Sequence, residues 1–144
     1  FVKIYDLSQD NISPLHYFTL LENDIMDASL VSLGQDRVVL VVLSQHGVIY
    51  SHRIPTGASH GACILTDVLT LPATFKTDRG ISLHYSLALR LLFLSFSDGL
   101  SLVAHLDADG TSFTDVSGYE TKFCWFAQLE RAHRYWARFI HLSF

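Results

Sequence analysis

From the first residue to Ser117, short runs of hydrophobic positions alternate along this chain with polar turn residues. Runs rich in Val, Ile, Leu, Tyr and Phe, bounded by Gly, Asp, Asn, Pro and Ser, are typical of β-strands. No segment in this part has the three-to-four-residue spacing of an amphipathic helix, so it is predicted to be all-β. The predicted strands are 2–7, 15–21, 25–33, 37–44, 48–54, 63–71, 81–86, 89–97, 100–106 and 112–117.

Two of these strands, 37–44 and 89–97, are almost uninterrupted apolar runs, RVVLVVLS and LRLLFLSFS. A strand with one solvated face alternates apolar and polar residues, whereas a strand covered on both faces is apolar at nearly every position. Both strands are therefore predicted to lie between neighbouring layers of the protein.

A strand and its preceding turn recur along the chain at intervals of about 50 residues. His46-Gly47 and Asp98-Gly99 are placed as two-residue hairpin turns that need positive φ. The strands after them begin at Val48 and Leu100, 52 residues apart, and Phe1 lies 47 residues before Val48. Four strands in a repeat of this length are typical of one blade of a β-propeller.

The predicted fold is a partial, open, WD-like β-propeller of about two and a half four-stranded blades over residues 1–118. Residues 1–21 end one blade, 24–71 form the second, and 80–117 form the third. A closed propeller typically has 4–8 blades, so we expect a piece of a larger protein or a chain that covers its open faces with a partner. A β-sandwich also offers short strands at regular spacing, and a stand-alone β-sandwich that binds a ligand or acts as an enzyme stays the alternative.

The last segment, 119–144, departs from the strand pattern and is predicted to be a divergent tail with helical character. It admits two interpretations: an amphipathic helix that docks on a protein or a membrane surface, or a divergent or mispredicted end that is poorly folded. The apolar or aromatic positions at spacings of three and four are Phe126, Leu129, His133, Trp136 and Ile140.

Composition and charge argue against two classes of function, nucleic-acid binding and membrane spanning. The chain has 144 residues, of which 49% are hydrophobic and 17% charged, as in a folded domain. A net charge of −4 argues against nucleic-acid binding, because phosphate contacts need a basic face. The longest apolar run, 38–43, is far shorter than the roughly 20 residues of a membrane span. With only Cys63 and Cys124, a reducing, cytoplasmic compartment is favoured.

Candidate chemistry is sparse. His60 and Cys63 form the only close His/Cys pair, and the second half of a tetrahedral metal site is missing beside them. Ser97-Asp98-Gly99 is accounted for by the hairpin turn, and the chain has no nucleophile elbow or phosphate-binding glycine loop. We therefore assign no catalytic, cofactor-binding or metal-binding residue, and we expect no cofactor and no enzymatic activity.

The opening strand FVKIYDL (1–7) resembles the third strand of a WD repeat, with Tyr5-Asp6 where that repeat has Trp-Asp. Counted from the start of each strand, the matching positions are His52-Arg53 and Ala104-His105, so the aromatic–Asp pair is expected only in the first copy. The longer stretch FVKIYDLSQDNISPLHYFTL (1–20) is similar to the calossin/pushover family of giant E3 ubiquitin ligases. The similarity continues through VVLVVLSQHGVIYSHRI and LFLSFSDGLSLVAHL.

This resemblance implies a segment of a very large cytoplasmic scaffold that contains a β-propeller. In that family a separate cysteine/histidine-rich zinc box recognises destabilising N-terminal residues, and a distant region transfers ubiquitin. The plant members are linked to auxin transport. Neither active part matches this chain, so the resemblance implies a non-catalytic, protein-interaction segment. Its expected partners are proteins or the remainder of a larger propeller, with no nucleic acid and no transmembrane segment. The predicted amphipathic tail is compatible with peripheral membrane association.

Overall fold

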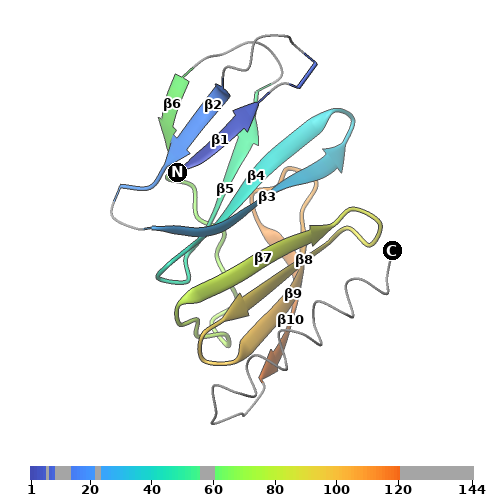
Figure 1. Ribbon diagram of the computed structural model, residues 1–144. Coiled ribbons are helices and arrows are strands. Elements are labelled where there is room, and N and C mark those ends of the chain that lie inside the picture. The colour runs from blue at the N-terminus through green and yellow to red at the C-terminus, as the bar shows by residue number, and fades with distance from the viewer. Residues whose placement is uncertain (6, 9–13, 22–23, 56–60, 121–144) are drawn as a thin grey trace.

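The structure of the protein is a computed structural model, and it describes residues 1–5, 7–8, 14–21, 24–55 and 61–120. All regular structure in these residues is β-strand, so the all-β prediction is confirmed for them. The ten strands, labelled in Figure 1, are β1 Val2–Tyr5, β2 Pro14–Thr19, β3 Ile25–Gly34, β4 Arg37–Ser44, β5 Ile49–Ile54, β6 Gly61–Ile64, β7 Gly80–Ser86, β8 Leu91–Phe96, β9 Leu100–Leu106 and β10 Phe113–Glu120.

The strands form three sheets, and each sheet is built mainly from strands that follow one another in the chain (Figure 1). The N-terminal sheet has the order β1-β2-β6, the middle sheet β3-β4-β5, and the C-terminal sheet β10-β9-β8-β7. Consecutive strands within each sheet pair antiparallel, and only β6 pairs parallel, with β2.

The middle sheet lies between the other two, and its central strand β4 shows why. Val39, Val41 and Leu43 belong to the core shared with the C-terminal sheet. Leu40 and Val42 point to the opposite face and belong to the core shared with the N-terminal sheet. All five side chains are at most 1% exposed. The expectation that the apolar run 37–44 is covered on both faces is confirmed.

The predicted single strand 63–71 is wrong, because the segment divides between two sheets. β6 pairs with β2, and Leu65 N–H continues that contact by donating to the carbonyl of Thr19 at 2.9 Å. Further on, Leu69 N–H donates to the carbonyl of Ile49 on β5 at 2.8 Å. Leu65 is buried in the core of the N-terminal sheet and Leu69 in that of the C-terminal sheet. One straight strand places residues i and i+4 on the same face, so the chain has to cross between sheets.

The two predicted hairpins are found, with a different turn geometry. Gly47 and Gly99 have φ of 76° and 91°, but His46 and Asp98 are not among the residues with positive φ. The turns thus need only one left-handed residue each, which glycine adopts without steric cost. The backbone of Gly47 also lies directly against the carbonyl oxygen of Asp78, so this turn contacts the segment that leads into β7.

The helix predicted within 119–144 concerns residues 121–144, which lie outside the described residues; Tyr119 and Glu120 are the last residues of β10. None of the described residues belongs to a helix long and apolar enough to cross a membrane.

Candidate functional site

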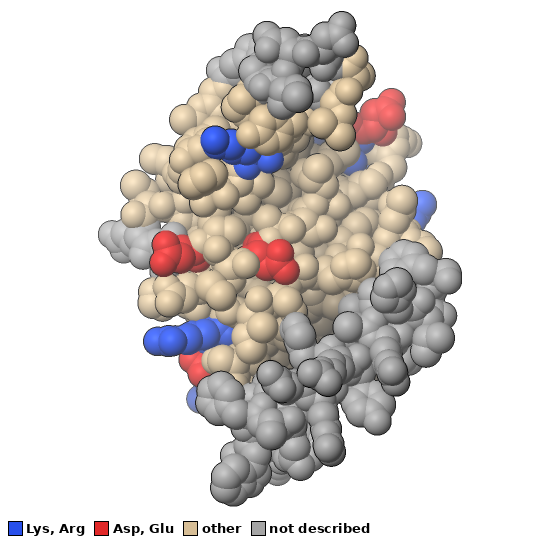
Figure 2. Space-filling model, in the orientation of Figure 1, with Lys and Arg blue, Asp and Glu red and all other residues tan. Residues whose placement is uncertain are grey.

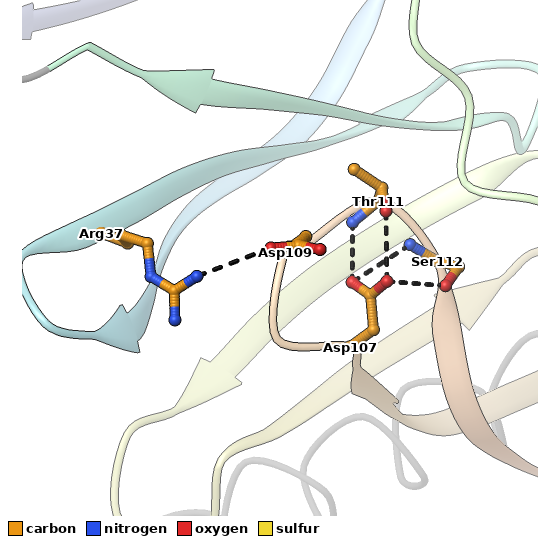
Figure 3. A network of polar contacts seen from close by, with 5 residues as sticks. All are labelled: Arg37, Asp107, Asp109, Thr111 and Ser112. Carbon is orange, nitrogen blue, oxygen red and sulfur yellow. Dashed lines mark hydrogen bonds and ion pairs between the residues drawn. The ribbon is translucent and has the colours of Figure 1, made fainter.

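Polar side chains gather where the β3–β4 turn meets the β9–β10 loop, at one end of the middle and C-terminal sheets (Figure 3). We call this region the loop end. The β3–β4 turn is tight because Gly34, Gln35 and Asp36 all have positive φ, at 83°, 53° and 59°. It brings Arg37, the first residue of β4, to face the β9–β10 loop.

The β9–β10 loop is organised around the carboxylate of Asp107, the residue after β9. Its Oδ1 accepts hydrogen bonds from the backbone N–H groups of Thr111 and Ser112, at 2.8 and 3.4 Å. Its Oδ2 accepts from the hydroxyls of the same two residues, at 3.1 and 2.9 Å (Figure 3). The backbone closes the same loop, since Asp107 N–H donates to the carbonyl of Ser112 at 2.9 Å.

These contacts decide the protonation of Asp107. Burial by itself would raise the pKa of this carboxyl, but the four hydrogen bonds from Thr111 and Ser112 outweigh it and hold the pKa below its usual value. The carboxylate is therefore ionised throughout the neutral range, and its acceptor capacity is used within the loop. This chemistry is that of a loop anchor.

Two contacts connect the loop end across the sheets. Arg37 Nη1 lies 3.5 Å from Asp109 Oδ1, an ion pair in which the Asp109 side chain is 75% exposed. Gly110, with φ of 72°, lets the loop backbone approach Val39 on β4 so closely that a Cβ would clash with the valine methyl. The ion pair is solvated and contributes little to stability, so the packing on Val39 is the tighter constraint on the loop.

Hollows open on both sides of this contact. One of about 390 Å³ lies between Arg53, Asp67 and the loop residues Asp109 and Thr111. Another, of about 650 Å³, is lined by the β3–β4 turn, Arg53, Ile54 and Pro55. Charged side chains, among them the exposed Arg53, line both hollows beside apolar residues such as Ile54 and Val68. This mixed lining suits contact with another polypeptide better than enclosure of a small molecule.

The residues weighed for metal or nucleophile chemistry are not brought together in the described part of the chain. His60 and Cys124 lie outside the described residues. Cys63 is half-buried on β6, and its thiol lies 3.6 Å from the carbonyl of Ile64. Ser97 donates to Asp78 in the segment before β7, and Asp98 accepts from Leu100 N–H within the hairpin. No group of three or more His, Cys, Asp and Glu suited to a metal ion occurs among the described residues.

Sequence reasoning missed Asp107, and the strand ends show the signal that would have found it. β1 ends at Tyr5 and β9 ends at Leu106, and each is followed by an aspartate in the sequence. The strand pairing supports this alignment of β1 with β9. Tyr5 is paired with Pro14, the first residue of β2, and Leu106 is paired with Phe113, the first residue of β10. Aligned from their ends, both strands are followed by the aspartate, and Leu106 stands where the first strand has the aromatic Tyr5.

The chain is similar to short parts of very long proteins. It is 45% identical over 117 residues to "Auxin transport protein BIG" of Oryza sativa subsp. japonica, a match that covers 81% of this chain and 2% of the rice protein. It is 39% identical over 99 residues to a "Probable E3 ubiquitin-protein ligase" of Dictyostelium discoideum, covering 69% and 2%. It is 30% identical to "Protein purity of essence" of Drosophila pseudoobscura pseudoobscura, covering 81% and 3%.

No family model matches the chain. No solved structure matches it either. Since the chain spans only 2–3% of the length of these relatives, it corresponds to one small region of each.

Proposed function

Because this chain is homologous to a segment of Auxin transport protein BIG and belongs to the same family, we propose that it is a non-catalytic scaffold segment of a BIG-like E3 ubiquitin ligase. In this role it forms part of a β-propeller and offers its loop end to other proteins or to the remainder of its own long chain. The ubiquitin transfer, N-degron recognition and auxin transport of the whole protein would depend on other regions.

The observation that carries the propeller is the stacking of antiparallel meanders. The middle sheet β3-β4-β5 and the C-terminal sheet β7 to β10 each follow chain order, as blades do, whereas Greek-key connections of a sandwich interrupt that order. The backbones of the two sheets approach each other most closely where β7 lies beside β3 and β4. Two meanders that touch at their first strands match the inner edges of neighbouring blades.

Side chains reinforce this inner edge. The Asp27 carboxylate on β3 accepts a hydrogen bond from the N–H of Leu83 on β7 at 2.8 Å. The hydroxyl of Tyr85 on β7 donates to the carbonyl of Ser32 on β3 at 3.1 Å. Both contacts use backbone groups of strands at the edges of their own sheets, so they hold the sheets together where the described residues supply no ladder partner.

The loop end supports a protein partner. Arg53 is exposed and lines both hollows. Nε of Arg37 is shielded from solvent and has no hydrogen-bond partner among the described residues. A carboxylate or carbonyl oxygen on a docking polypeptide can pair with the exposed guanidinium of Arg53, whereas Nε of Arg37 is already shielded by the chain itself.

The test is a charge reversal at the loop end of the full-length ligase, Arg53→Glu. We expect this variant to transfer ubiquitin to a model substrate at the unaltered rate and to lose a defined set of co-precipitating proteins. Lys76→Glu is the matched control, since Lys76 is also exposed but lies in the segment that contacts the Gly47 turn, at the other end of the sheets. Loss of ubiquitin transfer in the folded Arg53→Glu protein would contradict a non-catalytic role.

A further inference from the structure

A third hollow, of about 220 Å³, lies between the middle and C-terminal sheets, beside the β9–β10 loop. Its lining includes Val31 on β3 and Leu92 on β8, each 1% exposed and part of the core that the two sheets share. Leu33 and Leu106 line it as well and pack against the same core. We call this hollow the seam pocket. Because packed core side chains form its walls, the pocket is largely pre-formed, as ligand sites usually are.

Arg90 is the only Lys or Arg among the described residues that line the seam pocket. It is exposed and comes directly before β8, at the end of the β7–β8 turn. No side-chain hydrogen bond or ion pair with another described residue holds its guanidinium. The five N–H donors of this group, which form a planar fork, are therefore available to an acceptor that enters the pocket.

The backbone of Arg90 is held in a conformation that an arginine does not favour. Its φ is 54°, in the left-handed region, where a Cβ comes too close to the following carbonyl oxygen and glycine has no such cost. Strain of this kind clusters at binding and catalytic positions. The arginine here costs stability that a glycine would not, and its free guanidinium indicates a use for that side chain.

The other polar groups of the seam pocket restrict its ligand. The acceptors of the ionised Asp107 carboxylate are used within the β9–β10 loop (Figure 3). The hydroxyl of Tyr85 donates its proton to the carbonyl of Ser32 at 3.1 Å, so its oxygen remains as an acceptor. His105 alternates with Leu106 along β9, so its side chain points to the opposite face of the sheet. The described residues of the pocket therefore offer one available cation, one acceptor oxygen and apolar walls.

We propose that the seam pocket binds a carboxylate on a peptide segment of a protein partner. The guanidinium of Arg90 pairs with the carboxylate, the Tyr85 oxygen accepts a peptide N–H, and apolar carbons of the peptide lie against the leucines of the lining. The pocket is smaller than the roughly 300–1,000 Å³ of sites that enclose a drug-sized molecule, so it fits one acidic side chain or the C-terminal carboxylate of a chain. This inference rests on the proposed role of the loop end as a protein-binding surface, and it names the group that is bound.

A carboxylate fits this pocket better than a phosphate or a polyanion. A single guanidinium forms two parallel hydrogen bonds with a single carboxylate, and their charges balance. The second negative charge of a phosphate would have no cation and would be repelled by Asp107, which lines the same pocket. Lys and Arg side chains are also scattered singly over the face in Figure 2, and the described residues there form no basic patch. The expected ligand is a monoanion.

The experiment titrates the 144-residue chain with three short peptides and follows the backbone amides of Leu33, Leu92 and Leu106 by NMR. Acetyl-Leu-Glu-Leu-amide has its carboxylate on a side chain, acetyl-Leu-Leu-Leu has it at the C-terminus, and acetyl-Leu-Gln-Leu-amide has none. We expect a carboxylate peptide to bind at least about tenfold more tightly than the glutamine peptide, because a hydrogen bond to a charged group contributes more than a neutral one. The tighter of the two carboxylate peptides identifies the source of the carboxylate.

Arg90→Gly removes the guanidinium and relieves the left-handed strain in one substitution. We expect it to raise the midpoint of thermal unfolding, since the relief of strain outweighs the added freedom of the unfolded chain, and to weaken binding of the carboxylate peptide at least about tenfold. Arg90→Gln keeps the strain and removes the charge, and it should lose the same affinity. Gln35→Gly is the matched control, because Gln35 has a similar φ of 53°, carries no charge and does not line the seam pocket. It should raise the midpoint and leave the affinity unchanged.

Three results would each overturn the proposal: no shift of the pocket amides at about 10 mM peptide, equal affinities for the three peptides, or an unchanged affinity in the folded Arg90 variants. An equal loss of affinity in Gln35→Gly would place the ligand at the β3–β4 turn and would also overturn it.

These outcomes are separate from the test of the proposed function, because Arg53 does not line the seam pocket. Failure of the peptides to bind leaves the partner loss expected for Arg53→Glu unaffected. Loss of ubiquitin transfer in Arg53→Glu would contradict the scaffold role and would leave the peptide affinities of the 144-residue chain unchanged.

Discussion

The Asp27 carboxylate makes the most informative single contact between the middle and C-terminal sheets. Its Oδ2 accepts from Leu83 N–H at 2.8 Å, and its Oδ1 accepts from Ala28 N–H at 2.9 Å. Leu83 is 5% exposed, so its amide has little access to water as a substitute acceptor. Asp27→Ala leaves this donor unsatisfied, which costs about 1–3 kcal/mol of unfolding free energy.

Asp27→Asn separates the lost charge from the lost acceptor. The asparagine oxygen can still accept from Leu83, but a neutral hydrogen bond is roughly half as strong as a charge-assisted one. We therefore expect Asp27→Asn to lose about half of what Asp27→Ala loses. Tyr85→Phe removes the other link, to the carbonyl of Ser32, and should cost about 0.5–1.5 kcal/mol.

Urea unfolding of the three variants measures the free energies, and hydrogen exchange locates the effect. The Leu83 amide should exchange faster in Asp27→Ala relative to the amide of Leu94, which lies in the interior strand β8 and responds only to global opening. A folded Asp27→Ala protein with wild-type protection at Leu83 would refute the assignment. Stability within about 0.5 kcal/mol of the parent, the range of neutral surface substitutions, would do the same.

Three further outcomes follow from the loop end and the turns. Because the pKa of Asp107 is lowered by folding, this carboxylate contributes stability that is present above the unfolded pKa of about 3.9 and is lost as pH falls through the folded value. Asp107→Asn should therefore destabilise the protein by about 1 kcal/mol at pH 7 and by less at pH 3. Thermal unfolding at the two pH values measures the difference. Asp109→Ala should change the unfolding free energy by less than about 1 kcal/mol in urea titrations, because its ion pair is exposed, and a larger loss would mean that the pair is structural. In Gly47→Ala the new Cβ would be strained by the positive φ and would also clash with the Asp78 carbonyl, whereas in Gly34→Ala only the positive φ opposes it, with no atom within 4 Å. Gly47→Ala should therefore lower the unfolding free energy clearly more than the roughly 1–2 kcal/mol expected for Gly34→Ala. Equal losses in the two variants would contradict the close contact at Gly47.

The homology was readable from the residues, and three relatives confirm the resemblance to the family of giant ligases. Residues 1–20 carried it because an apolar strand that ends in Tyr5-Asp6 joins a specific following stretch. The later copies align by their strand ends, because β1 and β9 differ in length. Counting from strand beginnings therefore places Ala104-His105 beside Tyr5-Asp6, where the structure places Leu106-Asp107.

Local pattern determined where most strands and turns lie. The apolar run of β4 predicts burial on both faces because each residue of a strand points to one side or the other, and every position from Val38 to Leu43 is apolar. The glycines at 47 and 99 predict the hairpins because only a residue without Cβ adopts positive φ freely. These features depend on a few neighbouring residues, so the sequence by itself determined them.

Only the tertiary structure decided which surfaces those strands share. Leu65 and Leu69 look like two positions of one strand, yet each fills a different core, and the segment divides to bury both. Asp27 looks like a polar residue at the start of a strand until β7 brings the Leu83 amide to it. Which sheets pack together depends on the apolar area that they bury and on the hydrogen-bond donors that they satisfy. Both quantities involve residues far apart in the chain, so the local periodicity of the sequence does not encode them.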